Sequence, residues 1–270
     1  MSRIITLTTE FGLTDGFVGT MKGVILGFNP NATIVDITHD IAPQNIEQGA
    51  FLFANAAKYF PADAIHVVVI DPGVGSARRP IAIQAGETVF VAPDNGVLTQ
   101  AIDNYQLAIH SLRIRAVHLN KPEYWLPRVS NTFHGRDVFA PVAAHLSLGV
   151  PLEALGDPID AWMRLSWCAA AFRAGDEIVG RAVHIDRFGN IITNIGEEML
   201  AGMDRARIVV RVGGQTLRGI KATYATAAPG EAIALISSSW QVEIAVRDGD
   251  AAQVLKAHVG DEVGVTLDRD

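Results

Sequence analysis

The sequence predicts an α/β protein, with an N-terminal α/β domain that has a largely parallel sheet and a smaller second domain of short strands. Strand and helix patterns alternate over the first half of the chain, as they do where helices cover both faces of a parallel sheet. Residues 66–70 form a nearly continuous apolar run, which is typical of a strand buried on both faces. After Glu177 the segments are short, β-rich and separated by turns, which indicates a small barrel or sandwich.

The elements of the first half can be read in order along the chain. The apolar and β-branched runs predict strands at 4–8, 33–37, 66–70, 81–84 and 89–92. Apolar residues at helical spacing predict helices at 18–26, 45–59, about 96–104 and 138–148. Asn29-Pro30 ends the first helix, and Asp71-Pro72-Gly73 ends the strand at 66–70.

The second half is expected to consist of strands at 178–185, 191–194, 207–212, 232–236, 242–246 and 263–267. Turn signals such as Pro229-Gly230 and Asp248-Gly249 separate them. Residues 161–177 carry Trp162, Trp167 and Cys168 without clear periodicity, so we interpret them as a linker. The expected domains are therefore 1–160 and 178–270.

The composition excludes several classes of protein. Of the 270 residues, 49% are apolar and 19% are charged, which excludes wholesale disorder. Cys168 is the single cysteine, so we expect neither a disulfide framework nor a Cys-rich zinc site, and we expect a reducing, cytoplasmic compartment. A net charge of −7 without a Lys/Arg run argues against nucleic acid. No signal peptide and no apolar run of about 18 residues is evident, so we expect no membrane association.

The segment from Asp71 to Pro80 is the most informative motif. It follows a buried strand, where open α/β sheets carry their functional residues. Arg78 is close enough along the chain to pair with Asp71, which would hold the carboxylate ionised and aim it. A tight turn with a structural ion pair explains the segment equally well. Gly73-Val74-Gly75 also suggests a dinucleotide fingerprint, but Arg78 replaces its third glycine and no helix pattern follows.

A second motif, 131–137, precedes the predicted helix at 138–148. Asp137 is expected to cap that helix, which leaves His134 on a loop beside a helix start. Histidine is the side chain most often used for proton transfer near neutral pH, although a lone loop histidine is more often a surface residue. His145 is too far from His134 for a metal pair, and no His-Glu-x-x-His motif occurs, so we expect no metal site.

Polar and aromatic residues elsewhere suggest binding. Phe188 offers a ring face for stacking, and Asn190 offers the paired donor and acceptor that suit a purine edge. A β-turn explains the same segment equally well. Glu10 belongs to a polar cluster after the first strand, and the serines at 237–239 precede a strand that contains Glu243.

Together these segments resemble the S-adenosyl-L-methionine (SAM) hydroxide adenosyltransferases, which are SAM hydrolases related to fluorinase and chlorinase. The resemblance covers about residues 3–268. The motifs that carry it are TTEFGLTDGFVGTMKGVI, VVVIDPGVGSARRPIAI, FVAPDNGVLT, NTFHGRDVFAPVAAHL, IDRFGNIITNI and SSSWQVEIAV.

The resemblance implies an N-terminal α/β domain and a C-terminal β-barrel domain. It implies an enzyme that hydrolyses SAM to adenosine and L-methionine by attack of water or hydroxide at C5′, without a metal or cofactor. It further implies a homotrimer whose active sites lie between the N-terminal domain of one subunit and the C-terminal domain of the next.

Residue by residue, the resemblance implies that Asp71, Arg78 and His134 position the attacking water or hydroxide. The residues implied to contact adenosine or line its pocket are Glu10, Asp71, Asp186, Phe188, Asn190, Ser238, Glu243 and the backbone of Val246. The chain departs from the family's usual residues at Glu10, Trp240 and Arg247, where Asp, Gly and Asn are common.

Three other functions fit a SAM-binding site of this kind. A halogenase such as chlorinase has an uncharged residue where Asp71 stands, because a carboxylate repels a desolvated halide, and the fluorinase also carries an inserted loop near the short turn at 84–88. A non-catalytic adenosine or SAM binder would not need Asp71, Arg78 and His134 together. A methyltransferase would release S-adenosylhomocysteine instead of adenosine.

Overall fold

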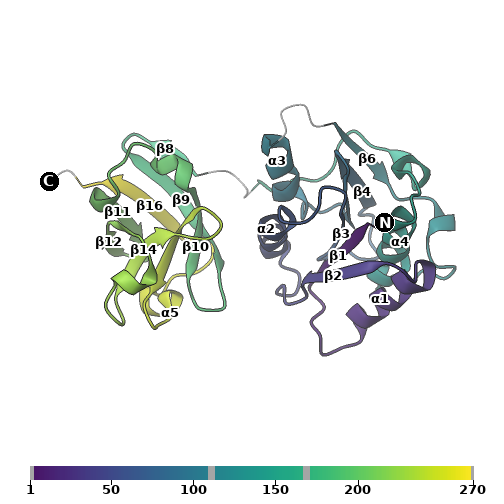
Figure 1. Ribbon diagram of the computed structural model, residues 1–270, viewed down its shortest axis with the longest axis horizontal. Coiled ribbons are helices and arrows are strands. Elements are labelled where there is room, and N and C mark those ends of the chain that lie inside the picture. Colours follow the sequence, from purple (N-terminus) through teal and green to yellow (C-terminus); the bar gives the residue numbers. More distant parts are fainter. Residues whose placement is uncertain (1–2, 109–112, 167–170, 269–270) are drawn as a thin grey trace. The chain divides into compact units, whose positions relative to one another are not determined.

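The computed structural model describes residues 3–108, 113–166 and 171–268. The chain divides into two compact units, Met1–Cys168 and Ala169–Asp270, each with its own hydrophobic core (Figure 1). The division falls within the segment predicted as a linker, 161–177. The mixed α/β fold class predicted from the sequence is confirmed.

In the described part of the first unit, seven strands form one sheet in the order β2-β1-β3-β5-β4-β6-β7. The bounds are β1 Ile4–Thr9, β2 Thr33–Thr38, β3 Ile65–Val69, β4 Pro80–Ala85, β5 Thr88–Pro93, β6 Ile114–His118 and β7 Asp157–Pro158. Strands β2, β1, β3 and β5 are parallel, and β4, β6 and β7 extend the sheet in antiparallel fashion. Only Gly86 and Glu87 separate β4 from β5, which is too few residues for a parallel crossover.

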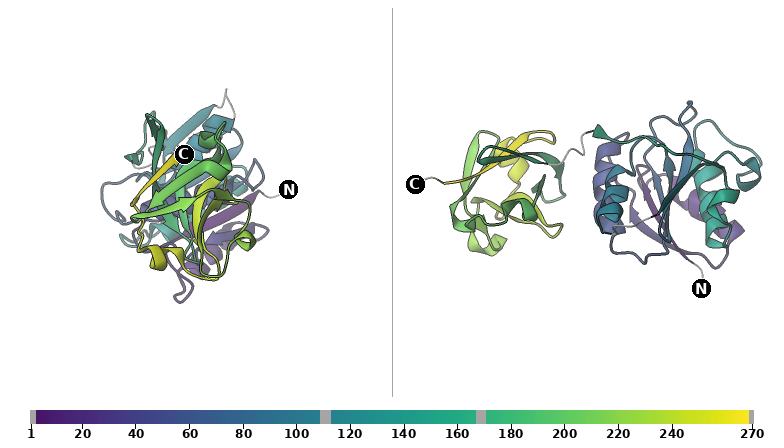
Figure 2. Two further views of the ribbon diagram at one scale, coloured as in Figure 1. Left: turned by 90° about the vertical axis from the view of Figure 1, so that its left-hand side faces the viewer. Right: turned by 90° about the horizontal axis from the view of Figure 1, so that it is seen from above.

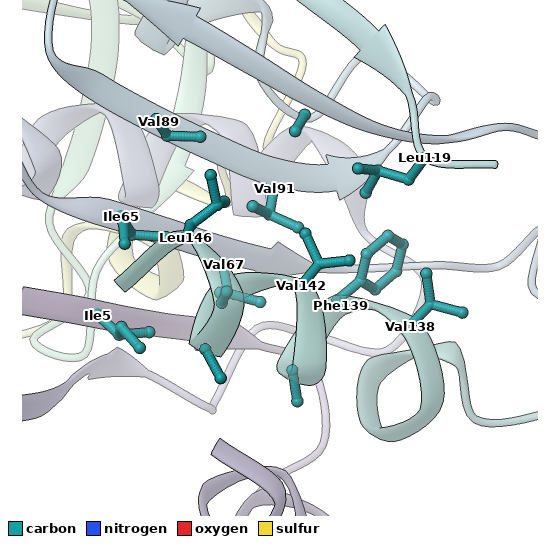
Figure 3. Packing of buried hydrophobic residues seen from close by; sticks show 14 of the residues in the cluster. Ile5, Ile65, Val67, Val89, Val91, Leu119, Val138, Phe139, Val142 and Leu146 are labelled. Atoms are coloured by element: carbon teal, nitrogen blue, oxygen red, sulfur yellow. The ribbon is translucent and has the colours of Figure 1, made fainter. Parts of the chain in front are cut away.

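Helices cover both faces of this sheet (Figure 2). Their bounds are α1 Phe17–Phe28, α2 Ile46–Ala57, α3 Thr99–Ala108 and α4 Ala140–Ser147. Alternate residues of a strand point to opposite faces, so Val67 of β3 joins the core with α1 and α4, whereas Val68 joins the core with α2 and α3. In Figure 3, Val142 and Leu146 of α4 lie against this first face of the sheet.

The helix expected at 138–148 begins earlier than predicted. A π-helical turn at Gly135–Phe139 precedes α4, and His134 occupies the capping position. The prediction that Asp137 caps this helix is wrong, because Asp137 lies inside the turn and is fully buried. Its carboxylate finds its donors elsewhere, at the backbone N–H of Ser130 (2.8 Å) and the side chain of Arg136 (2.6 Å).

In the second unit, the described strands form a barrel-like sheet of nine strands in the order β12-β11-β16-β9-β10-β15-β14-β13, with β8 paired to β9. Their bounds are β8 Phe172–Ala174, β9 Glu177–Ile185, β10 Ile191–Gly196, β11 Ile208–Val212, β12 Gln215–Arg218, β13 Ile220–Lys221, β14 Ala232–Ile236, β15 Gln241–Val246 and β16 Glu262–Leu267. Helix α5 spans Ala251–Leu255. Short 3₁₀ turns complete the chain at Pro122–Tyr124, Leu152–Ala154, Glu197–Leu200, Arg205–Arg207 and Tyr224–Thr226.

Both ends of the segment predicted as a linker are held by hydrogen bonds, one end to the first unit and the other to the second. The backbone N–H groups of Met163 and Leu165 donate to Asp94 (2.7 Å) and Thr99 (3.0 Å) of the first unit, and β8 pairs with β9 of the second. Trp167 and Cys168 lie outside the described residues. None of the helices in the described ranges has the length and apolar character needed to cross a bilayer.

Candidate active site

The polar residues predicted in the first unit meet at one edge of its sheet. β1 and β3 are parallel neighbours, with Thr9 opposite Val69 in the register. Glu10 follows the end of β1, and Asp71 follows the end of β3. Parallel strands present their carboxyl ends at the same edge, and this edge is the common location of functional residues in open α/β sheets.

Asp71 and Arg78 form a bidentate pair. Arg78 Nε donates to Asp71 Oδ1 at 2.9 Å, and Arg78 Nη2 donates to Oδ2. The side chains of Asp71 and Arg78 are only 5% and 9% exposed, so water screens this pair little. The guanidinium also lies over the ring of Phe139, 5.4 Å from its centroid. Both partners are thereby held in one orientation, as the spacing of the motif predicts.

Gly75 joins the loop of this pair to the loop that carries His134. Its φ is +76°, and a Cβ built on it would lie 2.3 Å from the carbonyl oxygen of Asn131. Any side chain at this position would therefore push the two loops apart. Only glycine lets the backbone at this position lie directly against the histidine loop.

His134 completes a chain of hydrogen bonds with Arg78 and Asp71. Its Nδ1 lies 2.9 Å from Arg78 Nη2. Because arginine only donates, Nδ1 must accept, and the imidazole is therefore neutral with its proton on Nε2. Burial lowers the pKa of His134, and the Arg78 charge lowers it further, against the opposing effect of Asp71 and Asp137. The site thus offers a carboxylate acceptor and an imidazole N–H donor on either side of one guanidinium.

One nitrogen of the Arg78 guanidinium does not take part in these hydrogen bonds. Nη1 is buried and has no hydrogen-bond partner among the described residues. Buried guanidinium N–H groups are rarely left without an acceptor, so this atom is suited to hold a water, a hydroxide or a polar atom of a substrate.

Glu10 contacts backbone rather than side chains. Its Oε1 accepts the N–H of Asp71 at 2.7 Å, and its Oε2 accepts the N–H of Gln44. The structure therefore brings Glu10, Asp71, Arg78 and His134 into one connected set of hydrogen bonds. Among the described residues, no group of three or more His, Cys, Asp or Glu side chains is arranged to hold a metal ion.

The second unit contains a cavity of about 580 Å³ that gathers several of its predicted residues. The residues that line it are Phe188, Asn190, Tyr224, Ala225, Val246, Arg247, Asp248 and Gly249. Phe188 and Tyr224 are 75% and 45% exposed. An open cavity with two accessible aromatic rings and a buried amide is suited to a flat, polar-edged ring such as a nucleobase.

Asp186 organises the turn that presents Phe188 and Asn190. Its Oδ1 accepts the backbone N–H of both residues, at 2.8 and 2.9 Å, and its Oδ2 accepts the side-chain amide of Asn190 at 3.0 Å. Gly189 adopts a φ of +82°. This is the β-turn that the sequence suggested, and it also fixes the Asn190 amide.

Glu243 lies on β15, where it is buried, and it is not one of the residues that line the cavity. It accepts a hydrogen bond of 2.5 Å from the hydroxyl of Tyr224. Burial raises the pKa of Glu243, and burial together with this hydrogen bond also raises the pKa of Tyr224. Sequence reasoning missed Tyr224, because nothing in its neighbourhood marks a contact with a strand residue 19 positions later.

Ser238, Trp240 and Arg247 have different surroundings. Ser238 is exposed in the turn between β14 and β15, at the opposite end of β15 from Val246, and does not line the cavity. Trp240, in the same turn, is 63% exposed and has a φ of +65°. Arg247 lines the cavity and donates to the carbonyl oxygen of Ala227 at 2.5 Å, which ties down the end of the turn that carries Tyr224.

Comparison with known proteins matches both units. The profile of the SAM hydroxide adenosyltransferase N-terminal domain matches residues 5–156, and that of the corresponding C-terminal domain matches residues 180–264. The (R)-S-adenosyl-L-methionine hydrolase of Salinispora tropica is 37% identical over 97% of both chains. A crystal structure of an uncharacterized conserved protein from Thermotoga maritima has a TM-score of 0.90 and 35% identity, covering 97% of this chain and 100% of that chain. The fluorinase of Nocardia brasiliensis is 28% identical over 71% of both chains.

Proposed function

Because the chain belongs to the SAM hydroxide adenosyltransferase family, we propose that it hydrolyses SAM to adenosine and L-methionine by attack of water or hydroxide at C5′. The observation that carries this proposal is the hydrogen-bonded chain of Asp71, Arg78 and His134. Nearly full-length similarity to a SAM hydrolase supports the same reaction.

The chemistry of the substrate explains why this set suffices. The sulfur of SAM is a sulfonium, so methionine leaves as a neutral thioether and needs no general acid. The difficult part is to bring a weak nucleophile in line with the C5′–S bond and away from bulk water. Positioning of this kind contributes up to about 7–11 kcal/mol to a reaction barrier.

We assign the roles by charge and donor capacity. Asp71 accepts a hydrogen bond from the attacking water and takes the proton that the new C5′–O group must lose. Arg78 holds Asp71 ionised and stabilises a hydroxide when hydroxide is the attacking species. His134, neutral with its proton on Nε2, donates to the oxygen and orients it. The products are adenosine, methionine and one proton, which returns to solvent from Asp71.

We further propose that the adenosine moiety is held by residues of both units. Those of the first unit are Glu10 and Asp71, and those of the second are Asp186, Phe188, Asn190, Ser238, Glu243 and the backbone of Val246. The cavity lined by Phe188 and Asn190 supports this assignment. Tyr224, which faces the same cavity, joins the set.

The family resemblance favours a homotrimer in which the first unit of one subunit and the second unit of the next share a substrate. Light scattering measures the mass. Co-expression of an Asp71→Asn chain with a Phe188→Ala chain tests the sharing, because mixed trimers then contain some sites with both residues intact. At low SAM concentration the mixture should exceed the activity of either variant alone. Activity that only averages the two variants contradicts shared sites.

The single cysteine favours the reducing cytoplasm as the place of action.

The halogenase and binding-protein alternatives are less well supported. The carboxylate of Asp71 disfavours a desolvated halide, and only Gly86 and Glu87 connect β4 to β5, where the fluorinase carries an insertion. A sensor for adenosine or SAM would gain nothing from Arg78 and His134 arranged around a buried carboxylate.

Product analysis in isotopically labelled water is the decisive experiment. Purified protein incubated with SAM in H₂¹⁸O should yield methionine and adenosine whose 5′-oxygen carries the label, without added metal or chloride. Release of S-adenosylhomocysteine would indicate a methyltransferase, and 5′-chloro-5′-deoxyadenosine formed with chloride would indicate a halogenase. Binding without any product at pH 6–9 would contradict the proposed reaction.

A further inference from the structure

Glu10 stands where the sequence departs from its family, and the structure gives this longer side chain an unexpected set of partners. Both carboxylate oxygens accept backbone N–H groups, from Asp71 (Oε1, 2.7 Å) and from Gln44 (Oε2). Hydrogen bonds from an amide to a carboxylate are stronger than those between neutral groups. Glu10 therefore connects three segments: the end of β1, the end of β3 and the residues that precede α2.

Each of the two amides belongs to a constrained segment. Gln44 has a φ of +67°, in the left-handed region that residues with a side chain rarely adopt. It directly precedes Asn45, whose side chain caps α2 by accepting the N–H of Gln48 at 2.9 Å. The bond to Glu10 is an interaction that offsets the cost of this backbone conformation.

Asp71 is thereby fixed at two places. Arg78 holds its carboxylate, with Nε 2.9 Å from Oδ1, and Glu10 holds its backbone N–H. The β1–β3 register, with Thr9 opposite Val69, leaves Glu10 level with Ile70, one residue before the amide that it binds. Aspartate at this position is shorter by one carbon–carbon bond, about 1.5 Å, and from the same backbone it would not reach both amides.

We propose that Glu10 is a positioning residue, which sets the place of the Asp71 carboxylate by bridging the backbone of Asp71 to that of Gln44. This inference rests on the proposed hydrolysis of SAM and adds to the contact with adenosine, on its ribose, that the family resemblance implies for Glu10. Each carboxylate oxygen has two lone pairs, so a ribose hydroxyl can still donate to Glu10 while the bridge is intact.

The two roles of Glu10 predict different losses. Loss of a ribose contact weakens substrate binding and raises KM, and the effect of the substitution then disappears for a substrate that lacks the hydroxyl. Displacement of the Asp71 carboxylate lowers kcat for every substrate, and a misplacement of about 1 Å can cost about 100-fold.

The first test uses the substrate-free protein, so it does not depend on turnover. Amide hydrogen exchange is measured for Asp71 and Gln44 in wild type, Glu10→Gln and Glu10→Asp. We expect faster exchange at one or both amides in each variant, because glutamine keeps only one acceptor oxygen and aspartate is too short to reach both N–H groups. The control is Glu47→Gln, which removes one negative charge from the exposed first turn of α2 and leaves the bridge in place. Wild-type exchange at both amides in both Glu10 variants would overturn the proposal.

The second test uses kinetics with SAM and its 2′-deoxy and 3′-deoxy analogues. Glu10→Gln should lower kcat about 10–100-fold for each substrate that the wild type turns over. An effect confined to KM, or one that vanishes with either deoxy analogue, would leave only a ribose contact and overturn the positioning role. If wild type does not hydrolyse SAM at all, the proposed function fails, and amide exchange still decides whether the bridge exists.

Discussion

The candidate site residues of the two units differ in how far they are exposed to solvent. In the first unit, the side chains of Asp71 and Arg78 are at most 9% exposed, and they bind each other. In the second, the aromatic residues that line the cavity are exposed, 75% for Phe188 and 45% for Tyr224. One unit presents a charged cluster that is already arranged, and the other presents an open aromatic surface.

In the proposed function, the first arrangement serves the reaction and the second serves recognition of the substrate. A charged group that must stabilise a transition state is most effective when its orientation is fixed before the substrate arrives, because no reorganisation is then required during the reaction. An exposed ring gains its contacts only when a ligand covers it. Substitutions in the Asp71–Arg78–His134 cluster should therefore change kcat, and substitutions that line the cavity of the second unit should change KM.

The largest expected effect is that of Asp71→Asn. The amide keeps the size of the side chain, loses the charge and cannot take a proton, so kcat should fall about 10²–10⁴-fold. Adenosine affinity, measured by calorimetry, should change only a few-fold, because the cavity of the second unit is untouched.

A matched control for Asp71→Asn exists in the same unit. Asp94 is also buried and paired to an arginine, with Arg79 Nε 2.9 Å from Oδ2. Asp94→Asn should lower the free energy of unfolding and leave kcat within a few-fold of wild type. Equal losses of kcat in both variants would mean that any buried carboxylate is needed for folding, and that Asp71 has no special part in the reaction.

The next largest effect concerns the pH dependence of stability, and it distinguishes the core of the first unit from that of the second. His66 of β3 is fully buried, with Nδ1 2.7 Å from Thr6 Oγ1 and its ring stacked on Phe90. Burial lowers the pKa of His66 to about 4. The unfolded chain takes up this proton below about pH 6.5, whereas the folded chain does so only near pH 4. The free energy of unfolding should therefore fall by about 3 kcal/mol between pH 7 and pH 4.

Urea unfolding at several pH values measures this dependence. His66→Phe fills the same aromatic core without a titrating group, so its unfolding free energy should lose about 3 kcal/mol less over the same range. His258→Gln changes an exposed histidine of the second unit and serves as the control. An unchanged pH dependence in His66→Phe would assign the acid sensitivity to other groups.

A smaller effect is expected for Phe188→Ala. Stacking of a base on an aromatic ring contributes about 1–3 kcal/mol, so KM for SAM should rise about 5–100-fold while kcat stays near that of wild type. Because the ring is exposed, the unfolding free energy should change by no more than about 0.5 kcal/mol. Phe172→Ala removes another exposed ring of the same unit, outside the cavity, and should leave KM unchanged. A fall in kcat alone would contradict the division between the units.

Features encoded within a few residues were predictable from the sequence. Asp71 and Arg78 are seven positions apart in one loop, and their pairing follows from the chemistry of the two side chains. The parallel part of the first sheet follows from the alternation of strands and helices. The antiparallel pairing of β4 with β5 follows from the short connection at Gly86 and Glu87, because two residues cannot form a parallel crossover.

Contacts between distant segments were not predictable in this way. His134 lies 56 residues after Arg78, and only the family resemblance connected the two. The hydrogen bond between Tyr224 and Glu243 depends on where a 3₁₀ turn meets a strand, which no local pattern specifies. The prediction for Asp137 was wrong because its local sequence fits a cap, whereas in the fold the backbone N–H of Ser130 donates to its carboxylate.

The smallest expected effect is a gain in stability at Trp240. This residue has a φ of +65° and is 63% exposed, so its ring contributes little burial to offset a backbone cost of about 1–2 kcal/mol. Glycine removes this cost but makes the unfolded chain more flexible by about 0.5–1 kcal/mol. Trp240→Gly should therefore raise the free energy of unfolding by up to about 1 kcal/mol, as measured in urea. Trp240→Asn should fall between glycine and wild type, and Trp240→Val should destabilise, because a β-branched residue tolerates positive φ least. A loss of stability in Trp240→Gly would show that the tryptophan ring makes contacts that outweigh its backbone strain, and the second unit would then be less open than its exposed rings indicate.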